Sequence, residues 1–287
     1  MRSLAIPLVI LGGLILMISA GTAAMFLMKP QPQPEPTKPS LVKIEDKKPL
    51  ETPKPIDRKE LKPDTMPEPH KADAKSKFKE LNKEKTLLLE TLDDGTKRIH
   101  FATEVCLREG VLLEVLVCKA QTKEHESILR TDLDAKLLHA GLVAIGAKPG
   151  HPVQFVDPKT KEEKYTAATG EKIKVTVNYN LQGKPFVHEA QDWIKDAKTK
   201  KTMSHGWVFA GSRFAKFPDQ PDGPDYYCAN NGEVIAISNF VDSMLDLPVQ
   251  LTSSNDDLMF EAFTEKVPAV GTPVWVILEI VPEAKKK

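Results

Sequence analysis

The chain has 287 residues, and its 40 Lys and Arg residues balance its 40 Asp and Glu residues, so that the formal net charge at pH 7 is zero. The chain also lacks P-loop and G-x-G-x-x-G motifs, and together these features argue against nucleic-acid binding and nucleotide binding. It contains three cysteines and no C-x-x-C pair, which argues against a zinc ribbon or thioredoxin-like chemistry.

Residues 1–28 are predicted to form a membrane anchor. Leu4 to Met28 is an uncharged run of 25 residues, flanked by Arg2 and Lys29. At about 1.5 Å per residue, a helix of this length spans roughly 37 Å, which exceeds a hydrocarbon core of about 30 Å. A cleaved signal peptide is the alternative, because small residues between positions 19 and 24 offer a cleavage site. Apolar residues continue beyond that site, so the sequence favours a retained, single-pass transmembrane helix.

The charges beside this segment give opposing indications of orientation. Arg2 and the terminal amine favour a cytoplasmic N-terminus, whereas the lysines from Lys29 to Lys48 favour the reverse. Long domains translocate largely regardless of such charges. We therefore expect the protein in the cell membrane, with its globular domain on the periplasmic or extracytoplasmic side.

Residues 29–85 are predicted to be a disordered linker rich in Pro, Lys and Glu. Residues 29–69 hold 11 of the 23 prolines, a composition typical of extended polyproline II chain with little apolar surface to bury. A soluble spacer is the favoured interpretation, and a ligand for anionic wall polymer or lipid headgroups is the alternative. Residues 70–85 lose the prolines, and we expect a short, exposed helix there.

Residues 86–281 are predicted to form the globular domain, followed by a basic tail at 282–287. Helical periodicity predicts one clear helix at about 132–146, capped by Asp132 and closed by Gly146. The remaining apolar runs are short and predict strands. The strand candidates are 98–106, 111–118, 127–130, 153–156, 172–179, 207–210, 234–238, 258–263 and 274–281, with the last one central. The predicted fold class is therefore α+β: a mixed, strand-rich domain with one clear helix.

An ordered series of motifs in this region resembles the YdjY-domain family of bacterial envelope proteins. The motifs are Cys106-Leu-Arg-Glu-Gly110, Leu113-Glu-Val-Leu-Val-Cys118, Thr122-Lys-Glu-His-Glu-Ser127, Leu137-Leu-His-Ala-Gly-Leu142, Lys148-Pro-Gly150, Gly206-Trp-Val-Phe-Ala-Gly-Ser212, Ser238-Asn-Phe240, Leu245-Asp-Leu-Pro248 and Gly271-Thr-Pro-Val274. The resemblance covers most of residues 86–281. It implies a secreted or membrane-attached bacterial domain, and it implies neither a reaction nor catalytic roles.

The segment 123–127 offers the best candidates for a binding or catalytic site. His125 beside Glu126 could serve as a metal ligand or a general base. A metal site normally needs three or four ligands, and the spacing of His139, His151 or His188 does not require any of them to join this pair. A turn held by hydrogen bonds and ion pairs explains the segment equally well. For His139 we expect a hydrogen-bonded place beside the core.

The three cysteines are expected to be free, buried thiols. The sequence between Cys106 and Cys118 suggests a hairpin with its turn near Glu109 and Gly110. In that hairpin the two cysteines would lie roughly 20 Å apart at about 3.3 Å per residue, too far for a disulfide.

The leading functional hypothesis is a membrane-tethered, non-enzymatic envelope domain that binds an envelope protein or a cell-wall polymer. The second hypothesis is a metal-dependent or hydrolytic enzyme that uses His125 and Glu126. The third is a structural module without a ligand. The sequence predicts no cofactor and no metal site.

Overall fold

The computed structural model describes residues 66–110, 112–157, 159–181, 183–217, 219–251 and 260–282. The predicted transmembrane helix, residues 29–65 of the predicted linker and residues 283–287 of the basic tail lie outside this part of the chain. Within the described residues, no helix combines the length and the apolar character needed to cross a membrane.

Eight strands of the main sheet close into a barrel. Each strand hydrogen-bonds to the next, and β5 returns to pair with β3. In order around the ring the strands are β3 (Lys97–Val105), β17 (Pro273–Ile280), β8 (Lys172–Leu181), β11 (Trp207–Phe209), β15 (Leu245–Asp246), β14 (Ile235–Ala236), β4 (Val115–Lys119) and β5 (Ser127–Thr131). The prediction of a central strand near 274–281 is confirmed, because β17 lies between β3 and β8 and pairs with both.

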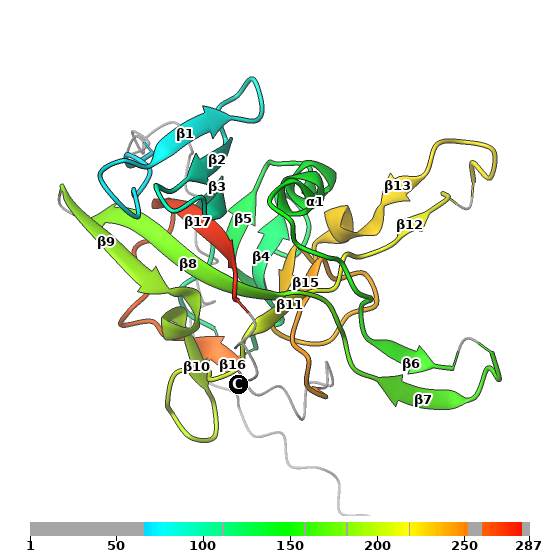
Figure 1. The fold of residues 1–287 in the computed structure, drawn as a ribbon. Coiled ribbons are helices and arrows are strands. Elements are labelled where there is room, and N and C mark those ends of the chain that lie inside the picture. Colours follow the sequence, from blue (N-terminus) through cyan, green and yellow to red (C-terminus); the bar gives the residue numbers. More distant parts are fainter. Residues whose placement is uncertain are drawn as a thin grey trace, which may run out of the picture. The chain divides into compact units, whose positions relative to one another are not determined.

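The remaining strands extend or decorate the barrel (Figure 1). β1 (Lys77–Glu80) and β2 (Leu87–Thr91) continue the sheet outward from β3, and β9 (Lys184–Glu189) pairs with β8. Three separate ribbons pair β6 (Gln154–Val156) with β7 (Glu163–Thr166), β10 (Ile194–Asp196) with β16 (Phe260–Ala262), and β12 (Phe214–Ala215) with β13 (Tyr226–Tyr227). Two 3-10 turns, η1 (Ala190–Trp193) and η2 (Cys228–Asn231), follow β9 and β13.

The predicted helix is α1 (Ala135–Ala144). Its N-cap is Asp134 rather than Asp132, since the Asp134 carboxylate accepts the backbone N–H of Lys136 at 2.9 Å. The chain leaves the helix through Gly146, whose φ of +100° favours glycine. Leu138 and Leu142 are buried in the same core as the strands.

The α+β prediction is wrong: the described residues form a β-barrel with a single helix. Among them, 17 strands accompany one α-helix, and that helix contributes to the barrel's own core instead of forming a second layer. The sequence could not reveal the closure, because it depends on pairs such as β3 with β17 that lie far apart along the chain.

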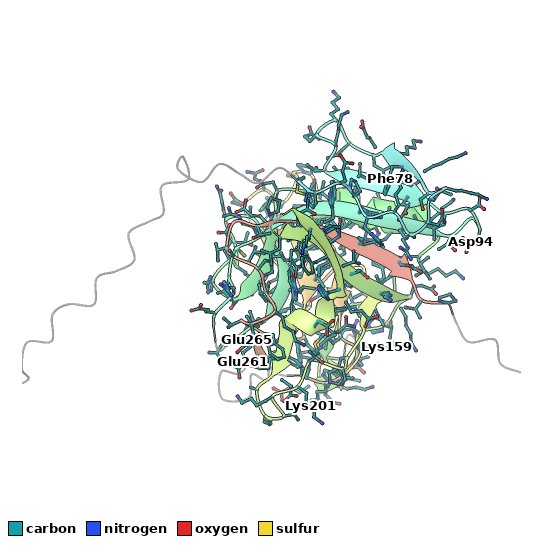
Figure 2. The ribbon with its side chains drawn as sticks, turned by 90° about the vertical axis from the view of Figure 1, so that its left-hand side faces the viewer. Phe78, Asp94, Lys159, Lys201, Glu261 and Glu265 are labelled. Atoms are coloured by element: carbon teal, nitrogen blue, oxygen red, sulfur yellow. The ribbon has the colours of Figure 1, made fainter. Side chains whose placement is uncertain are left out.

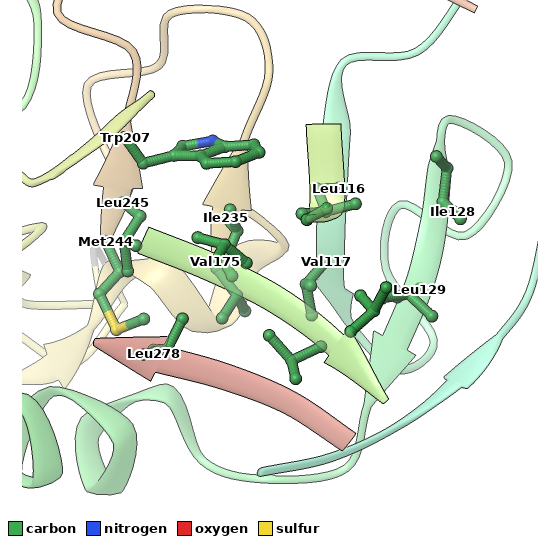
Figure 3. Packing of buried hydrophobic residues seen from close by; sticks show 14 of the residues in the cluster. Leu116, Val117, Ile128, Leu129, Val175, Trp207, Ile235, Met244, Leu245 and Leu278 are labelled. Carbon is green, nitrogen blue, oxygen red and sulfur yellow. The ribbon is translucent and has the colours of Figure 1, made fainter. Parts of the chain in front are cut away.

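The core lies inside this ring. Alternation along β8 sends Ile173, Val175 and Val177 inward and leaves Lys172 and Lys174 exposed. Figure 3 shows aliphatic side chains from strands on opposite sides of the ring meeting there, among them Val175 of β8 and Val117 of β4.

Residues 66–80 fold onto the barrel, although their sequence predicts that they belong to the linker. Where we expected an exposed helix, β1 forms as a strand, because an edge of the sheet is free to pair with it. The carbonyl of Pro67 accepts the indole N–H of Trp275 at 2.7 Å. Figure 2 places Phe78 of β1 at the opposite end of the domain from Lys201 and Glu261.

This N-terminal segment covers a buried carboxylate that is hydrogen-bonded to a histidine ring. Glu90 and His100 are fully buried and lie 2.9 Å apart, and the backbone N–H of Ala72 donates to Glu90 at 2.8 Å. Burial pushes the pKa of Glu90 upward, but the hydrogen bonds from His100 and Ala72 outweigh it and lower the pKa to about 2. Residues 66–76 therefore satisfy a charge that the barrel alone would leave incompletely bonded.

The predicted hairpin between residues 106 and 118 is also wrong. β4 pairs with β5 in parallel and with β14, whereas β3 pairs with the other edge of β5. Cys106, Cys118 and Cys228 carry free thiols, as expected. The separation expected for Cys106 and Cys118 does not hold, because both lie beside β5.

Candidate functional site

The loop at residues 120–126, between β4 and β5, carries most of the predicted site residues. It forms a turn in which the backbone N–H of Glu126 donates to the carbonyl of Lys123 at 3.1 Å. Gln121 has a φ of +67°, which bends the chain sharply as it leaves β4. The loop directs Lys123 and Glu126 to one charged cluster and Glu124 to another.

The first cluster surrounds the ammonium of Lys123. Its Nζ lies 2.9 Å from Glu126, 3.4 Å from Glu233 and 3.7 Å from Glu114. The same nitrogen lies 4.3 Å from the centre of the Phe240 ring, which adds a cation–π contact. We call Lys123, Glu114, Glu126 and Glu233 the lysine cluster.

Burial perturbs the carboxyl groups of the lysine cluster. It raises the pKa of Glu233, whose side chain is only 9% exposed and whose Oε2 has no hydrogen-bond partner among the described residues. Burial and the charge of Glu126 raise the pKa of Glu114. Burial alone would lower the pKa of Lys123, but the three neighbouring carboxylates raise it by more. The pKa of Lys123 therefore lies above its usual value, and the ammonium stays charged. A charged ammonium is not a nucleophile, so the cluster can take up protons but cannot attack a substrate through Lys123.

The close approach of Lys123 depends on Gly232. A Cβ at position 232 would lie 2.8 Å from Cγ and Cδ of Lys123, and the φ of Gly232 is +135°. Only glycine tolerates both the contact and the backbone angle. The lysine cluster therefore fixes the loop at residues 120–126 against the segment that follows η2.

The second cluster centres on Arg130 of β5. Its guanidinium lies 2.6 Å from Glu104 and 3.1 Å from Glu124. These three residues line a cavity of about 530 Å³ between the loop at residues 120–126, β3 and the start of α1. The charged residues of its lining are Arg130, Glu84, Glu104, Glu124, Asp132 and Asp134. With five acidic groups against one basic group, we call it the acidic cavity.

The structure keeps His125 beside Glu126 but places His139 elsewhere. His125 is 78% exposed at its side chain, and its Nε2 lies 3.8 Å from Glu126. His139 lies elsewhere, on α1, where its Nδ1 is 2.9 Å from the hydroxyl of Tyr227. That hydroxyl donates to the carbonyl of Gly211 at 2.9 Å, so Nδ1 of His139 is the donor to the tyrosine.

His139 occupies the hydrogen-bonded position beside the core that the sequence predicts. Its ring packs edge-on against Phe209, and burial lowers its pKa. His125 and His139 do not meet. No group of three or more His, Cys, Asp or Glu side chains in the described part of the chain is arranged to hold a metal ion.

Sequence reasoning missed the partners of this loop. Lys123 and Glu126 belong to the motif at residues 122–127, but nothing in the spacing of the sequence links them to Glu114 or Glu233. Arg130 is the one charged residue of β5, so the sequence could have indicated it, although not its partners across the sheet.

Comparison with known proteins identifies the domain. A family model described as the YdjY domain matches residues 91–279. No curated protein and no solved structure matches the chain. The matched region runs from the last residue of β2 to the last but one of β17, so it contains the barrel except Ile280, the lysine cluster, and the acidic cavity except Asn82, Glu84 and Thr86.

Proposed function

Because the chain belongs to the YdjY-domain family, we propose that it is a binding domain of the cell envelope, attached to the membrane through its apolar segment at residues 4–28. The length of that segment and the proline-rich stretch after it support attachment at a distance from the bilayer. In this arrangement the barrel lies on the extracytoplasmic side and binds an envelope protein or a wall polymer.

The observation that carries the proposal is the acidic cavity. A volume of about 530 Å³ lies within the range of roughly 300–1,000 Å³ that is usual for ligand pockets. Five carboxyl groups against one guanidinium favour a ligand with positively charged groups, such as lysine side chains or amine-bearing sugars. The bonds from Arg130 to Glu104 and Glu124 hold one wall of the cavity in place before any ligand arrives.

Binding of trilysine to the detergent-solubilised full chain tests this proposal, with triglutamate as the comparison peptide. Calorimetry at low salt should detect trilysine only, and binding should weaken as salt is raised. The variants Glu104→Gln and Asp132→Asn should each weaken binding by about two- to fivefold, as expected for partly exposed charge pairs. Glu162→Gln, an exposed change far from the cavity, is the matched control. Equal binding by all three variants, or no preference for trilysine, would refute the proposal.

Membrane attachment has its own test. Protease added to spheroplasts should cleave the barrel only if it lies on the extracytoplasmic side, and washing isolated membranes with carbonate should leave the full chain in the pellet. Release of the protein into the wash would contradict a membrane-attached domain.

An enzyme that uses His125 and Glu126 is the second candidate. The raised pKa values of Glu114 and Glu233 favour it, because perturbed carboxyl groups are typical of catalytic sites. His125→Ala separates the two functions. An enzyme or metal site would lose its hydrolytic activity or its bound metal, whereas trilysine binding in the acidic cavity should not change.

A further inference from the structure

One outward surface of the barrel wall, built by β2, β3, β17 and β8, is buried. Along β17, Val276 points into the core, so Trp275 points outward, where it lies opposite Asn178 of β8. Glu90 points outward in the same way from β2. These side chains are nevertheless only 4%, 1% and 0% exposed for Trp275, Asn178 and Glu90. We call this surface, with those three side chains as its anchors, the docking face.

Residues 67–72 lie on the docking face as an extended strip of chain. Each anchor bonds to one of its backbone groups: the carbonyl of Pro67 accepts the indole N–H of Trp275 at 2.7 Å, the N–H of His70 donates to Oδ1 of Asn178 at 3.2 Å, and the N–H of Ala72 donates to Oε1 of Glu90 at 2.8 Å. In the part of the chain that the structure describes, no backbone–backbone hydrogen bond joins residues 66–72 to the barrel.

The side chains of this strip show what the docking face recognises. Pro67 is buried and Pro69 is half-buried, whereas the other four side chains are exposed: Glu68, His70, Lys71 and Ala72. The face therefore contacts two prolines and three backbone groups, and it does not select the remaining side chains. Proline fixes its own φ, so a Pro-x-Pro peptide is already extended and loses little entropy when it binds.

The docking face and its occupant belong to different parts of the chain. Trp275 and Asn178 lie within the residues that match the YdjY model, whereas residues 67–72 precede the matched region. The domain thus supplies two of the three anchors itself, and a stretch from outside the matched region covers them. A second stretch with the same contact groups would fit the same anchors.

Residues 53–58 carry the same contact groups. A frame, meaning Pro-x-Pro with backbone N–H groups three and five positions after the first proline, begins at Pro67 in the docked strip. A frame also begins at Pro53, because Pro55 is its second proline and Ile56 and Arg58 both have an N–H. Its exposed positions differ in charge from those of the docked strip, but the docking face does not contact them.

The frame at Pro53 is the best placed of the alternatives. Frames also begin at Pro30 and Pro32, whereas the run from Pro34 fails because Pro39 lacks an N–H. The frame at Pro53 is nearest to the docking face along the chain, and a shorter loop costs less entropy to close. We propose that the docking face is a binding site for extended Pro-x-Pro peptides, and that residues 53–58 of the same chain exchange with residues 67–72 on it.

This exchange would change the length of free chain before the barrel. The frame at Pro53 begins 14 positions before the docked frame. Its docking shortens the free stretch by roughly 43 Å at about 3.1 Å per residue. In the membrane-attached arrangement proposed above, the exchange would set how far the barrel can lie from the bilayer. The docking face is separate from the acidic cavity, so failure of one proposal leaves the other standing.

Fluorescence polarisation tests the binding site on the detergent-solubilised full chain, with a labelled, end-blocked peptide of residues 52–58. Ala72→Pro removes the N–H that Glu90 accepts, so this variant should bind the peptide at least tenfold more tightly than the unchanged protein, whose own strip competes. Ala74→Pro is the matched control. Position 74 is the second residue of the turn closed by Ser76 and Asp73, where proline is tolerated, so binding should stay as in the unchanged protein.

Two comparisons show where the peptide binds. A peptide with Ala in place of both prolines has the same charge, so it would bind equally in the acidic cavity but should not bind to the docking face. Adding Trp275→Phe to Ala72→Pro removes the indole donor and should weaken binding about fivefold. Equal binding of the two peptides, or no effect of Trp275→Phe, would overturn the binding site. Pro67→Ala combined with Pro69→Ala guards against misfolding of Ala72→Pro, and failure of both variants to admit the peptide also overturns it.

A final comparison tests the occupant. In the Ala72→Pro variant, residues 53–58 of the same chain should occupy the docking face and compete with added peptide. Replacing Pro53 and Pro55 with Ala in that variant should therefore strengthen binding of the added peptide at least threefold. Unchanged binding would show that residues 53–58 do not dock, and would refute the exchange.

Discussion

Replacing Asp246 with Asn should remove a pH-dependent loss of stability from the barrel. Asp246 lies in β15 and is fully buried. Its Oδ1 accepts the backbone N–H of Leu247 at 2.7 Å and the side-chain amide of Asn239 at 3.2 Å. Its Oδ2 has no hydrogen-bond partner in the described part of the protein. Burial raises the pKa of Asp246 from 3.8 to about 7, against the lowering effect of these hydrogen bonds.

The magnitude follows from this shift. A rise from 3.8 to about 7 is about three units, and each unit corresponds to about 1.4 kcal/mol, which gives roughly 4 kcal/mol. The folded chain holds the proton more tightly than the unfolded chain does. The stabilisation is therefore complete below the unfolded pKa and is lost as pH rises through the folded pKa. Between pH 5 and pH 8, Asp246 should remove roughly 3 kcal/mol from the free energy of unfolding.

Guanidinium denaturation at the two pH values measures this effect, with the fluorescence of the buried tryptophans as the signal. Other carboxyl groups titrate as well, so the informative quantity is the pH dependence of the unchanged protein minus that of Asp246→Asn. Asp222→Asn, an exposed substitution of the same kind, should leave the pH dependence as it is. If Asp246→Asn and the unchanged protein lose equal stability between pH 5 and pH 8, the reasoning about this buried carboxyl is refuted.

Two further predictions concern the N-terminal segment and the lysine cluster. Deleting residues 66–76 along with everything before them should lower the free energy of unfolding by about 2–5 kcal/mol, because Glu90 loses the N–H of Ala72 in a buried site. Equal denaturation midpoints for fragments beginning at 66 and at 77 would contradict this. Gly232→Ala should cost about 2–4 kcal/mol, since the new Cβ meets Lys123 and the backbone is strained. Gly95→Ala, where φ is +85° but no atom lies within 4 Å, should cost about half as much when both are measured by denaturation, and equal costs would show that the contact is unimportant.

Much of the secondary structure could be predicted because it depends on local pattern. The run at 172–179 corresponds to β8, and the run at 274–281 corresponds to β17, within two residues at each end. The helix at about 132–146 corresponds to α1. Apolar periodicity and a glycine after the last helical turn locate the ends of such elements to within a few residues.

The fold class and the site could not be predicted, because they depend on pairing between distant segments. β14 and β15 have two residues each, too few to show any periodicity, yet both are members of the ring. The hairpin expected near Gly110 fails because β5 pairs with both flanking strands. The same pairings place Cys106 and Cys118 on the two sides of β5, an arrangement that the local hairpin register did not predict.

The contact of Pro67 with Trp275 determines how the domain would respond to force. A pull directed along the chain from its N-terminal side first reaches this hydrogen bond, then those of His70 and Ala72, and then β1, which pairs only with β2 among the strands described. An edge strand pulled from one end separates one hydrogen bond at a time, whereas each strand of the ring is held on both sides. Releasing residues 66–86 would lengthen the chain by up to roughly 70 Å at about 3.4 Å per residue. The barrel could thus take up strain by extending its own leading segment while its eight-stranded ring stays closed.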